Sequence, residues 1–340
     1  MAAQRIQVRP AAHSGILGVG AYRPRRVVSN DEVCRRLDST PEWIESRSGI
    51  VSRRFAGPEE TLCAMAVAAA GAALQHAGVT PDAVGCVIVA SMSNLVQTPP
   101  LAVLVADEIG AGRAAAFDLS GACAGFCHAL AVAGDTVRAG EVRYVLVIGV
   151  ERMTDIIDPA DRGVAFMFAD GAGAVLVGPT SAPAIGPVVR GANGAFREAL
   201  RMSASWAEFG ADPQRERPVM RMDGRRVFRW AVEEVVTAGR QALRDAGLGV
   251  SDLAAFVPHQ ANLRMIDVLA DRLELPAHVV VARDVVTAGN TSAASIPMAL
   301  RRLLDNSAAA PGGPALLFGF GAGLNYAGQV VLLPAGGARR

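Results

Sequence analysis

A cysteine, a histidine and an asparagine have the side-chain types and settings that nucleophilic catalysis needs. Cys123 lies in DLSGACAGFCHAL, where the tight Gly121-Ala122 turn precedes a predicted helix. The positive end of a helix dipole and its unsatisfied N–H groups lower the pKa of a thiol and favour the nucleophilic thiolate. His259, in AFVPHQANLR, follows a predicted strand, and Asn290, in AGNTSAASIP, stands just ahead of another predicted helix. The sequence therefore predicts a cysteine nucleophile with these two residues as candidate partners.

Each of these residues also has a purely structural interpretation. A cysteine among small residues is more often a buried apolar side chain, and we interpret Cys127, one turn further along the same predicted helix, in that way. The histidines interpreted as ordinary core or surface residues are His13, His76, His128 and His278. Asn290 is alternatively a helix N-cap, because asparagine is favoured there. Its Asn-Thr-Ser context also matches a glycosylation sequon, which a cytoplasmic location excludes.

The glycine-rich segment GFGAG, residues 319–323, follows a predicted apolar strand. Glycine lets the main chain approach a ligand and present N–H donors, although a sharp turn with positive φ is the structural alternative. The segment is not a dinucleotide fingerprint, because a strand follows it and its spacing differs from GxGxxG. We therefore place it among the loops that build the site.

The elements that position these residues occur twice in the chain. Residues 72–94 and 241–262 both predict a helix that ends at a glycine, a short turn, an apolar strand and a polar loop. A small-residue loop, a helix, an apolar strand and a hairpin partner strand follow in both copies. We predict two halves, residues 1–180 with the cysteine and residues 181–340 with the histidine and the asparagine.

The predicted strands are continuous Val/Ile/Leu runs, and they alternate with predicted helices. This pattern predicts an α/β fold with mainly parallel sheets. The duplication predicts two such sheets packed with pseudo-symmetry. Ligands in open α/β sheets bind beyond the carboxyl ends of the strands, so corresponding loops are expected to converge on one site. We expect Asn290 to occupy roughly the place in the second half that Cys123 has in the first. Residues 179–223, rich in Pro, Gly and Arg, predict irregular surface or a lid.

The composition excludes several classes of protein. All 33 basic residues are arginine, so enzymes that need a lysine amine (Schiff-base enzymes, pyridoxal phosphate enzymes and P-loop ATPases) are excluded. A net charge of +1 gives no global field for nucleic acid or a membrane surface. No apolar run reaches the roughly 18 to 20 residues of a membrane span, and the N-terminus lacks a signal peptide's apolar region, so a cytoplasmic location is expected. The five cysteines are scattered without metal-ligand spacing, and no metal site is expected.

The whole chain, from LGVGAYRPRRVVSN to GFGAGLNYAGQVVLLP, resembles β-ketoacyl-acyl carrier protein synthase III, a condensing enzyme of the thiolase superfamily. The resemblance rests on DSTPEWIESRSGIVSRRFAGPEET, DLSGACAGFCHAL, DPADRG with FADGAGAVLVG, VPHQANLR, GNTSAAS and GFGAG. GACAGFCHAL and MDGRRVFRWAV are similar to the actinobacterial members that prime aromatic polyketide synthases. The resemblance implies a thiolase-like duplicated fold, with two pseudo-symmetric βαβαβαββ halves in α-β-α-β-α layers.

The catalytic Cys-His-Asn triad of that family falls on Cys123, His259 and Asn290. The resemblance implies that Cys123 accepts a short acyl group from acyl-CoA, and that malonyl-acyl carrier protein then loses CO2. The resulting carbanion attacks the acyl-cysteine and gives a 3-oxoacyl product that initiates fatty acid or aromatic polyketide synthesis. His259 and Asn290 would donate hydrogen bonds to the malonyl thioester oxygen. The N–H groups of Cys123 and of the Gly321-Ala322 turn would form the oxyanion hole. No cofactor is implied beyond these two substrates.

The resemblance also assigns contacts to the substrates. Trp43 would lie against the CoA adenine, Arg47 beside the CoA phosphates, and Asn262 along the pantetheine arm. Phe320 would close the acyl and malonyl pocket, and the loop that contains Leu95 would shape the acyl pocket near a dimer interface. A homodimer is expected on the same ground.

Docking of an acidic carrier protein is assigned to Arg264. Because the chain has no lysine, arginines such as Arg47, Arg264 and Arg53 would have to supply the whole basic rim around the active-site tunnel. The sequence departs from the family pattern at two positions. Ala322 replaces a frequent glycine in the oxyanion turn, and Asp155 stands where an adenine-clamping arginine often occurs.

Two other functions fit the same fold. One is an acyl-CoA-dependent acyltransferase of secondary metabolism, against which Asn290 argues, because the expected relatives have an acid at that position. The other is a non-catalytic partner that binds carrier protein, against which Cys123 argues. The sequence fixes neither the starter acyl group nor the choice between the two pathways.

Overall fold

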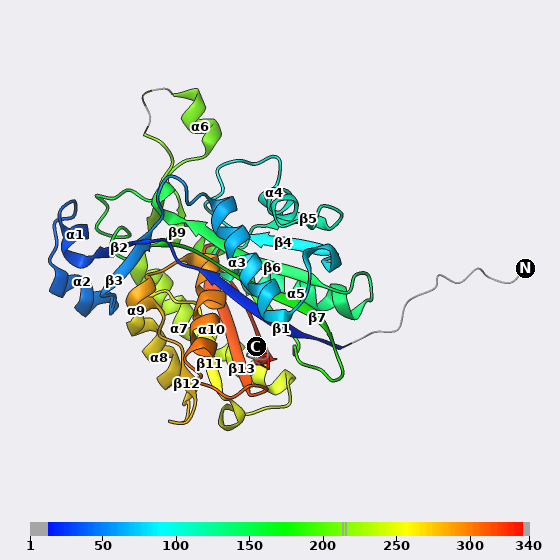
Figure 1. Ribbon diagram of the computed structural model, residues 1–340. Helices are drawn as coiled ribbons and strands as arrows, with labels where there is room; N and C mark the ends of the chain where they lie inside the picture. Colours follow the sequence, from blue (N-terminus) through cyan, green and yellow to red (C-terminus); the bar gives the residue numbers. More distant parts are fainter. Residues whose placement is uncertain (1–12, 213, 215, 336–340) are drawn as a thin grey trace, which may run out of the picture.

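The computed structural model describes residues 13–212, 214 and 216–335, and they form two five-stranded sheets with helices between and outside them (Figure 1). The first sheet has the order β1-β7-β6-β4-β5, with the bounds His13–Tyr22, Asp170–Thr180, Val145–Arg152, Cys86–Ala90 and Ala115–Leu119. β4 pairs in parallel with β5 and β6, whereas β7 is antiparallel to both of its neighbours, β6 and β1. The sheet is therefore mixed, with its parallel part at the β5 side.

The second sheet repeats this arrangement with later parts of the chain. Its order is β12-β11-β13-β14-β8, with the bounds Val280–Val281, Ala255–Pro258, Pro314–Gly321, Asn325–Leu332 and Val189–Ala192. β11 pairs in parallel with β12 and β13, and β14 is antiparallel to β13 and β8. Position by position, β8, β14, β13, β11 and β12 correspond to β1, β7, β6, β4 and β5. The predicted duplicated α/β fold is confirmed, but the prediction of mainly parallel sheets is wrong, because each sheet has two parallel and two antiparallel strand pairs.

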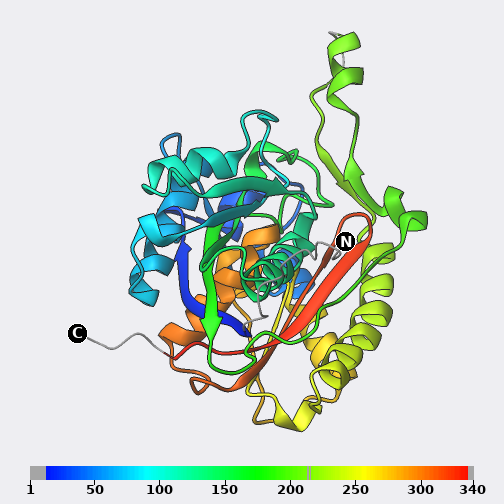
Figure 2. The same ribbon diagram turned by 90° about the vertical axis from the view of Figure 1, so that its right-hand side faces the viewer.

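The helices form three layers around the two sheets (Figure 2). α3 (Leu62–Ala77) and α4 (Leu101–Glu108) share a core with the outer face of the first sheet. α7 (Gly224–Asp245) and α8 (Leu263–Leu273) cover the outer face of the second. α5 (Gly125–Arg138) and α10 (Ser295–Asp305) lie between the sheets and contribute to one core with β4, β6, β11 and β13. This is the predicted α-β-α-β-α order.

Local signals explain where the outer helices begin and end. The Thr61 hydroxyl accepts a hydrogen bond from the Ala64 N–H at the start of α3, and Asp223 caps α7 in the same way. Gly78 ends α3 with a φ of 65°, and Gly247 follows α7 with a φ of 71°. Both glycines adopt the left-handed conformation that the repeat predicts.

Smaller elements extend each half. β2 (Arg26–Ser29) and β3 (Ser52–Phe55) form a hairpin whose connection contains α1 (Asn30–Cys34) and α2 (Pro41–Ser48). β9 (Leu200–Met202) and β10 (Met220–Met222) form a second hairpin that carries α6 (Trp206–Ala211). This second hairpin projects from the body (Figure 2), so the later part of the segment 179–223, which was predicted as irregular surface or a lid, is a projecting arm. The earlier part of that segment contributes β8 to the second sheet. α9 (Val285–Ala288) is a short helix directly before Asn290.

The predicted division at residue 180 falls between β7 and β8, but helices of both halves share the central core, so two separate domains stay a prediction. Within the described residues, no helix combines the length and the apolarity that a membrane crossing requires.

Candidate active site

Cys123 lies at the interface between the two halves of the fold, and we call such a contact of a turn with a strand end from the other half a crossing. Cys123 is the middle residue of a 3₁₀ turn (Ala122–Ala124) that leads into α5, and only 4% of its surface is exposed. The end of β13, from the other half, packs directly on this turn. A Cβ added at Gly321 would lie 2.8 Å from Cβ and 3.1 Å from Sγ of Cys123. Glycine is therefore required at residue 321 by the close approach of the backbone to the thiol.

The second half contains a corresponding turn, Ser292–Ala294, ahead of α10. Aligning the starts of α5 and α10 places Ala293, not Asn290, at the position of Cys123. The expectation that Asn290 is the counterpart of Cys123 is therefore wrong by three residues. At this second crossing, Gly149 of β6 packs on Ala293, and the buried Glu151 carboxylate accepts the Ala293 N–H at 3.4 Å.

His259 follows β11 and is fixed by both its backbone and its ring. Its N–H donates to the Phe318 carbonyl at 2.8 Å, and Nδ1 lies 2.8 Å from the Ser295 hydroxyl. The imidazole meets the Phe320 ring edge to face, with the centroids 5.3 Å apart. Burial lowers the pKa of His259 to about 3, so the ring is neutral near pH 7. Ser295, absent from the sequence prediction, is thus part of the site.

Asn290 is tied to the segment that precedes β7. Its N–H donates to the Met167 carbonyl at 2.8 Å, and its carbonyl accepts the Ala169 N–H at 2.9 Å. The side-chain Oδ1 accepts the Ser292 N–H at 2.9 Å. This contact is a local turn and not a helix N-cap: the N-cap residue of the 3₁₀ turn is Thr291 and that of α10 is Ala294, so the capping alternative for Asn290 is wrong. Because Oδ1 is occupied, the amide orientation is set, and Nδ2 remains as the donor.

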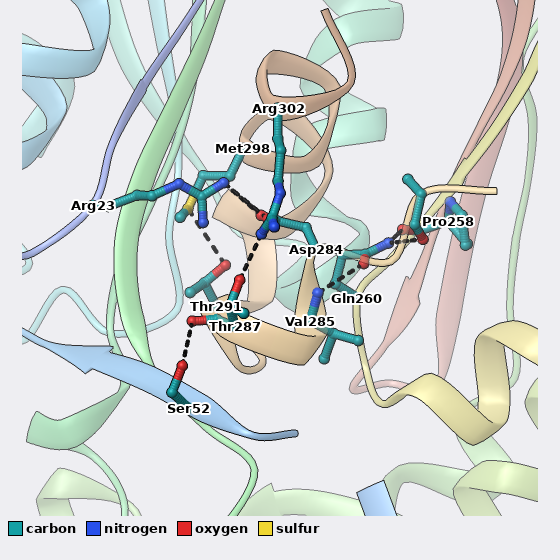
Figure 3. Close-up of polar contacts among 11 residues, drawn as sticks. Arg23, Ser52, Pro258, Gln260, Asp284, Val285, Thr287, Thr291, Met298 and Arg302 are labelled. Carbon is teal, nitrogen blue, oxygen red and sulfur yellow. Dashed lines mark hydrogen bonds and ion pairs between the residues drawn. The ribbon is translucent and has the colours of Figure 1, made fainter. Parts of the chain in front are cut away.

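A polar cluster behind the site fastens the histidine loop to α9. The Gln260 Nε2 donates to the carbonyls of Pro258 at 2.8 Å and Ala282 at 3.2 Å, and its Oε1 accepts the Val285 N–H at 3.1 Å (Figure 3). Asp284, the residue before α9, accepts hydrogen bonds from two arginines (Figure 3). Since α9 leads into Asn290, one cluster holds the loops of both His259 and Asn290.

The pKa of the Cys123 thiol differs from the sequence prediction. Burial raises the pKa of Cys123 to about 12, and the Glu151 carboxylate also raises it, while the Ser292 side chain acts in the opposite direction. The predicted lowering of this pKa by the helix start is therefore wrong. The reason is that the helix start lies under β13 of the other half, where a thiolate loses its hydration. Burial also raises the pKa of Cys127 to about 12, as befits a core residue.

The turn at Gly321 and Ala322, for which an oxyanion role is predicted, is held by side chains that the sequence did not single out. Gly321 and Ala322 lie where β13 turns into β14. The Asn325 side-chain amide donates to the Ala322 carbonyl, and its Oδ1 lies 3.1 Å from Nε2 of His128. His128, interpreted as an ordinary histidine, therefore links α5 of the first half to this turn. No local pattern marks this pair, because its two members are far apart in the chain.

Four residues assigned to CoA and carrier protein gather on α2 and at the start of α8. Trp43 is half-buried on α2, and Arg47 is exposed on the same helix. A Cβ added at Gly49, which ends α2, would lie 2.4 Å from Cβ of Leu263, so α2 meets the start of α8. The two residues assigned to ligand contacts at the start of α8 are Asn262, whose side chain caps the helix, and the exposed Arg264.

The arginines near α2 are not placed as the predicted basic rim requires. Arg53 has no exposed surface and donates to the Phe166 carbonyl at 2.8 Å, so it cannot belong to a basic rim. The guanidinium of Arg162 instead lies over the Trp43 ring, 4.4 Å from its centroid. Asp155, at the position of the frequent clamping arginine, pairs with Arg152 at 3.3 Å.

A pocket of about 590 Å³ opens beside the nucleophile turn. Its lining includes Ala122 and Ala322, together with Asn94, Val96 and Gln97. Leu95, assigned to the acyl pocket, is 44% exposed and does not line it, although both of its neighbours do. Phe320 is buried against His259, as its assignment requires. Among the described side chains, no group of three or more His, Cys, Asp or Glu is placed to hold a metal ion.

Comparisons with known proteins all lead to one family. The family model described as 3-oxoacyl-[acyl-carrier-protein (ACP)] synthase III matches residues 117–194, and its C-terminal counterpart matches residues 243–333. The chain is 59% identical to the β-ketoacyl-[acyl-carrier-protein] synthase III of Streptomyces lividans, over 97% of both chains. It is 50% identical to β-ketoacyl-[acyl-carrier-protein] synthase III 1 of Streptomyces coelicolor, over 95% of this chain and 97% of that one.

Solved structures agree with this. The priming β-ketosynthase of the R1128 polyketide biosynthetic pathway is 58% identical, with a TM-score of 0.97 over 98% of this chain and 100% of that chain. The 3-oxoacyl-[acyl-carrier-protein] synthase III of Aquifex aeolicus is 34% identical, with a TM-score of 0.87 over 94% and 99% of the two chains.

Proposed function

The chain belongs to the 3-oxoacyl-[acyl-carrier-protein] synthase III family, and we propose roles for its residues in the condensation reaction. This reaction joins a short acyl-CoA to malonyl-acyl carrier protein with loss of CO2. The observation that carries the proposal is the close approach of Gly321 to the buried Cys123 thiol. The ring of neutral His259 contacts Phe320, the residue before Gly321, and the amide of Asn290 is oriented by Ser292. These groups supply a nucleophile, N–H donors and no strong base, as a reaction driven by loss of CO2 requires.

In the first half-reaction, Cys123 Sγ attacks the acyl-CoA thioester carbon. The bond from that carbon to the CoA sulfur breaks, and the thiol proton ends on the departing CoA thiolate. The N–H groups of Cys123 and of the turn after Gly321 are proposed to stabilise the oxyanion, in a site from which water is largely excluded. Because the thiol is neutral before the reaction, its proton moves during the attack.

In the second half-reaction, malonyl-acyl carrier protein loses CO2, and the electron pair of the broken C–C bond forms an enolate. We assign to His259 and Asn290 the two hydrogen bonds to its thioester oxygen. The enolate carbon then attacks the acyl-Cys123 carbonyl, the bond from that carbon to Sγ breaks as the 3-oxoacyl product forms, and the released thiolate takes up a proton from solvent to regenerate the thiol. An amide suits this role, because it donates a hydrogen bond and takes up no proton.

The half-reactions can be measured separately in His259→Ala and Asn290→Ala. Malonyl decarboxylation is expected to fall about 10²- to 10³-fold in each variant, the range found when one such donor is removed. Intact-mass measurement after incubation with acyl-CoA should still show one acyl group on Cys123 in Asn290→Ala. Undiminished decarboxylation in both variants would exclude condensation and favour the simple acyltransferase, and no adduct on Cys123 in the unaltered protein would favour a non-catalytic partner.

For the pathway, we propose priming of polyketide synthesis. The support is the similarity to the R1128 priming ketosynthase, which is higher than that to the Aquifex enzyme in both identity and TM-score. A panel of acetyl-, propionyl-, isobutyryl- and longer acyl-CoAs, weighed as acyl-enzymes, tests which starter is accepted. Equal acylation by all of them would contradict a selective priming role.

We also propose a homodimer that forms through the β5 edge of the first sheet. β5 pairs with β4 on one side only, and Phe117 on this strand is 40% exposed. Val103 and Leu104 on neighbouring α4 are 41% and 42% exposed. An unpaired strand edge beside apolar side chains is suited to pairing with a second copy. Phe117→Arg should shift the mass measured by light scattering from dimer to monomer, and a monomeric unaltered protein would refute the proposal.

Docking of the carrier protein is proposed at the exposed Arg264. Arg264→Glu should raise KM for malonyl-acyl carrier protein and leave acylation of Cys123 by acyl-CoA unchanged. An equal loss in both steps would argue for a structural role of Arg264.

A further inference from the structure

A cavity of about 960 Å³ lies between α3, α10 and the β2–β3 hairpin, and we call it the arginine cavity. Its lining contains none of the residues assigned to catalysis or substrate binding, although two of its arginines, Arg23 and Arg302, bind Asp284 beside α9. Its charged lining consists of a single carboxylate, Asp305, and four arginines, Arg23, Arg54, Arg301 and Arg302. In a chain whose net charge is only +1, this is a strong local excess of positive charge.

Two of these arginines share one buried carboxylate. Asp284, which is 3% exposed, accepts hydrogen bonds from Arg23 at 2.8 and 3.0 Å and from Arg302 at 2.9 Å. Figure 3 shows both guanidinium groups converging on this side chain. A carboxylate carries one negative charge, so this group of three retains a net positive charge. Arg23 and Arg302 are 28% and 43% exposed, so a ligand in the cavity can reach them.

The other two arginines are held by different partners. Arg301 pairs with Asp305 at 2.7 Å and donates to the Val19 carbonyl at 2.9 Å. Arg54 donates to the carbonyls of Pro24 and Arg25 at 3.0 and 3.2 Å, and these neutral groups orient its guanidinium without cancelling its charge. The hydroxyl groups of Ser52 and Thr287 also line the wall. The cavity is thus rich in hydrogen-bond donors and has an uncompensated positive charge.

We propose that the arginine cavity binds the phosphate or pyrophosphate group of a nucleotide-sized ligand. Planar guanidinium groups match phosphate oxygens in pairs and are weakly hydrated, so they bind phosphate strongly. A volume near 960 Å³ lies at the upper end of the range for small-molecule sites and exceeds what a single phosphate fills. The concave shape favours such a ligand over an acidic protein surface.

The test is calorimetric titration of the full chain with three probes: inorganic phosphate, pyrophosphate and ADP. Arg54→Gln and Arg301→Gln are each expected to weaken pyrophosphate binding at least about tenfold, since a charge-assisted hydrogen bond contributes about 1.5 to 3 kcal/mol. Tighter binding of ADP than of pyrophosphate identifies a nucleotide, and equal binding identifies the pyrophosphate group as the whole ligand. Both results support the site, whereas no binding of any probe overturns it.

Two further variants locate the binding. Arg240→Gln is the matched control, because Arg240, like Arg301, pairs with a carboxylate, Glu274, and donates to a carbonyl, that of Arg272. It should leave binding unchanged, and thermal unfolding checks that every variant is folded. Arg47→Gln reports on the CoA site. Binding that is lost in Arg47→Gln but unchanged in Arg54→Gln and Arg301→Gln would overturn the proposal. Because the readout is binding, it does not depend on the proposed condensation.

Discussion

The Oγ of Ser295 lies 2.8 Å from Nδ1 of His259, and both side chains are buried. The same oxygen accepts the Gln260 N–H at 3.3 Å, so we infer that the hydroxyl proton is directed at Nδ1. The ring proton of neutral His259 is then on Nε2, which makes this nitrogen the donor that the enolate needs. We therefore propose that Ser295 is a positioning residue for His259.

Ser295→Ala should lower malonyl decarboxylation about ten- to a hundredfold, with most of the loss in kcat, because the imidazole loses its orientation and its tautomer. ¹⁵N chemical shifts of His259 should show a proton on Nε2 in the unaltered protein and a mixture in the variant. Ser295→Thr, which keeps the hydroxyl, should restore most of the activity. A normal ¹⁵N pattern in Ser295→Ala would show that the serine has only a packing role.

Gly321→Ala tests the close approach of β13 to the nucleophile. The added Cβ would lie 2.8 Å from Cβ of Cys123, so either the strand or the nucleophile turn must move. Acylation by acyl-CoA should fall at least about a hundredfold, the usual cost of misplacing reacting groups by about 1 Å. Gly112→Ala is the control, because a Cβ there meets open space. An acylation rate equal to that of the control would contradict the geometry.

The raised pKa of Cys123 predicts how its alkylation depends on pH. With a thiol pKa of about 12, the thiolate fraction rises tenfold for each pH unit across the neutral range. The rate of iodoacetamide labelling of Cys123, followed by peptide mass spectrometry, should therefore still be rising between pH 7 and 9. Cys123→Ser gives the background from the other cysteines. A plateau near pH 7 would instead support the thiolate that the sequence predicted.

The buried neutral His259 makes the fold sensitive to acid. Its pKa is about 3 in the folded chain and about 6.5 in an unfolded one, so between these values the unfolded chain binds a proton that the folded chain does not. Stability therefore falls as the pH drops below about 6.5, by about 2 kcal/mol between pH 6.5 and 5 from this residue alone. Urea unfolding of His259→Gln should show a smaller loss over this interval. The exposed His278→Gln should behave like the unaltered protein, and identical losses in all three would contradict the assignment.

The sequence predicted the features that depend on local patterns. Apolar strands and helix-ending glycines such as Gly78 and Gly247 repeat along the chain, and they are sufficient to predict two duplicated sheets, whereas the order of the layers was implied by the family resemblance. The features it missed arise where the halves meet. The pKa of Cys123 is raised because β13 covers the start of α5, and Arg53 is buried although its charge suggests exposure. Ser295 has no local signal, because its role depends on a histidine 36 residues away.

Glu151 has a consequence for how many acyl groups one chain carries. The duplication gives the molecule a second crossing, where Ala293 stands in the place of Cys123 and the Glu151 carboxylate occupies the N–H of Ala293. The donor that would make a second oxyanion hole is thus already taken by the protein's own anion. Introducing a thiol as Ala293→Cys is therefore expected to leave the labelling stoichiometry at one acyl group per chain.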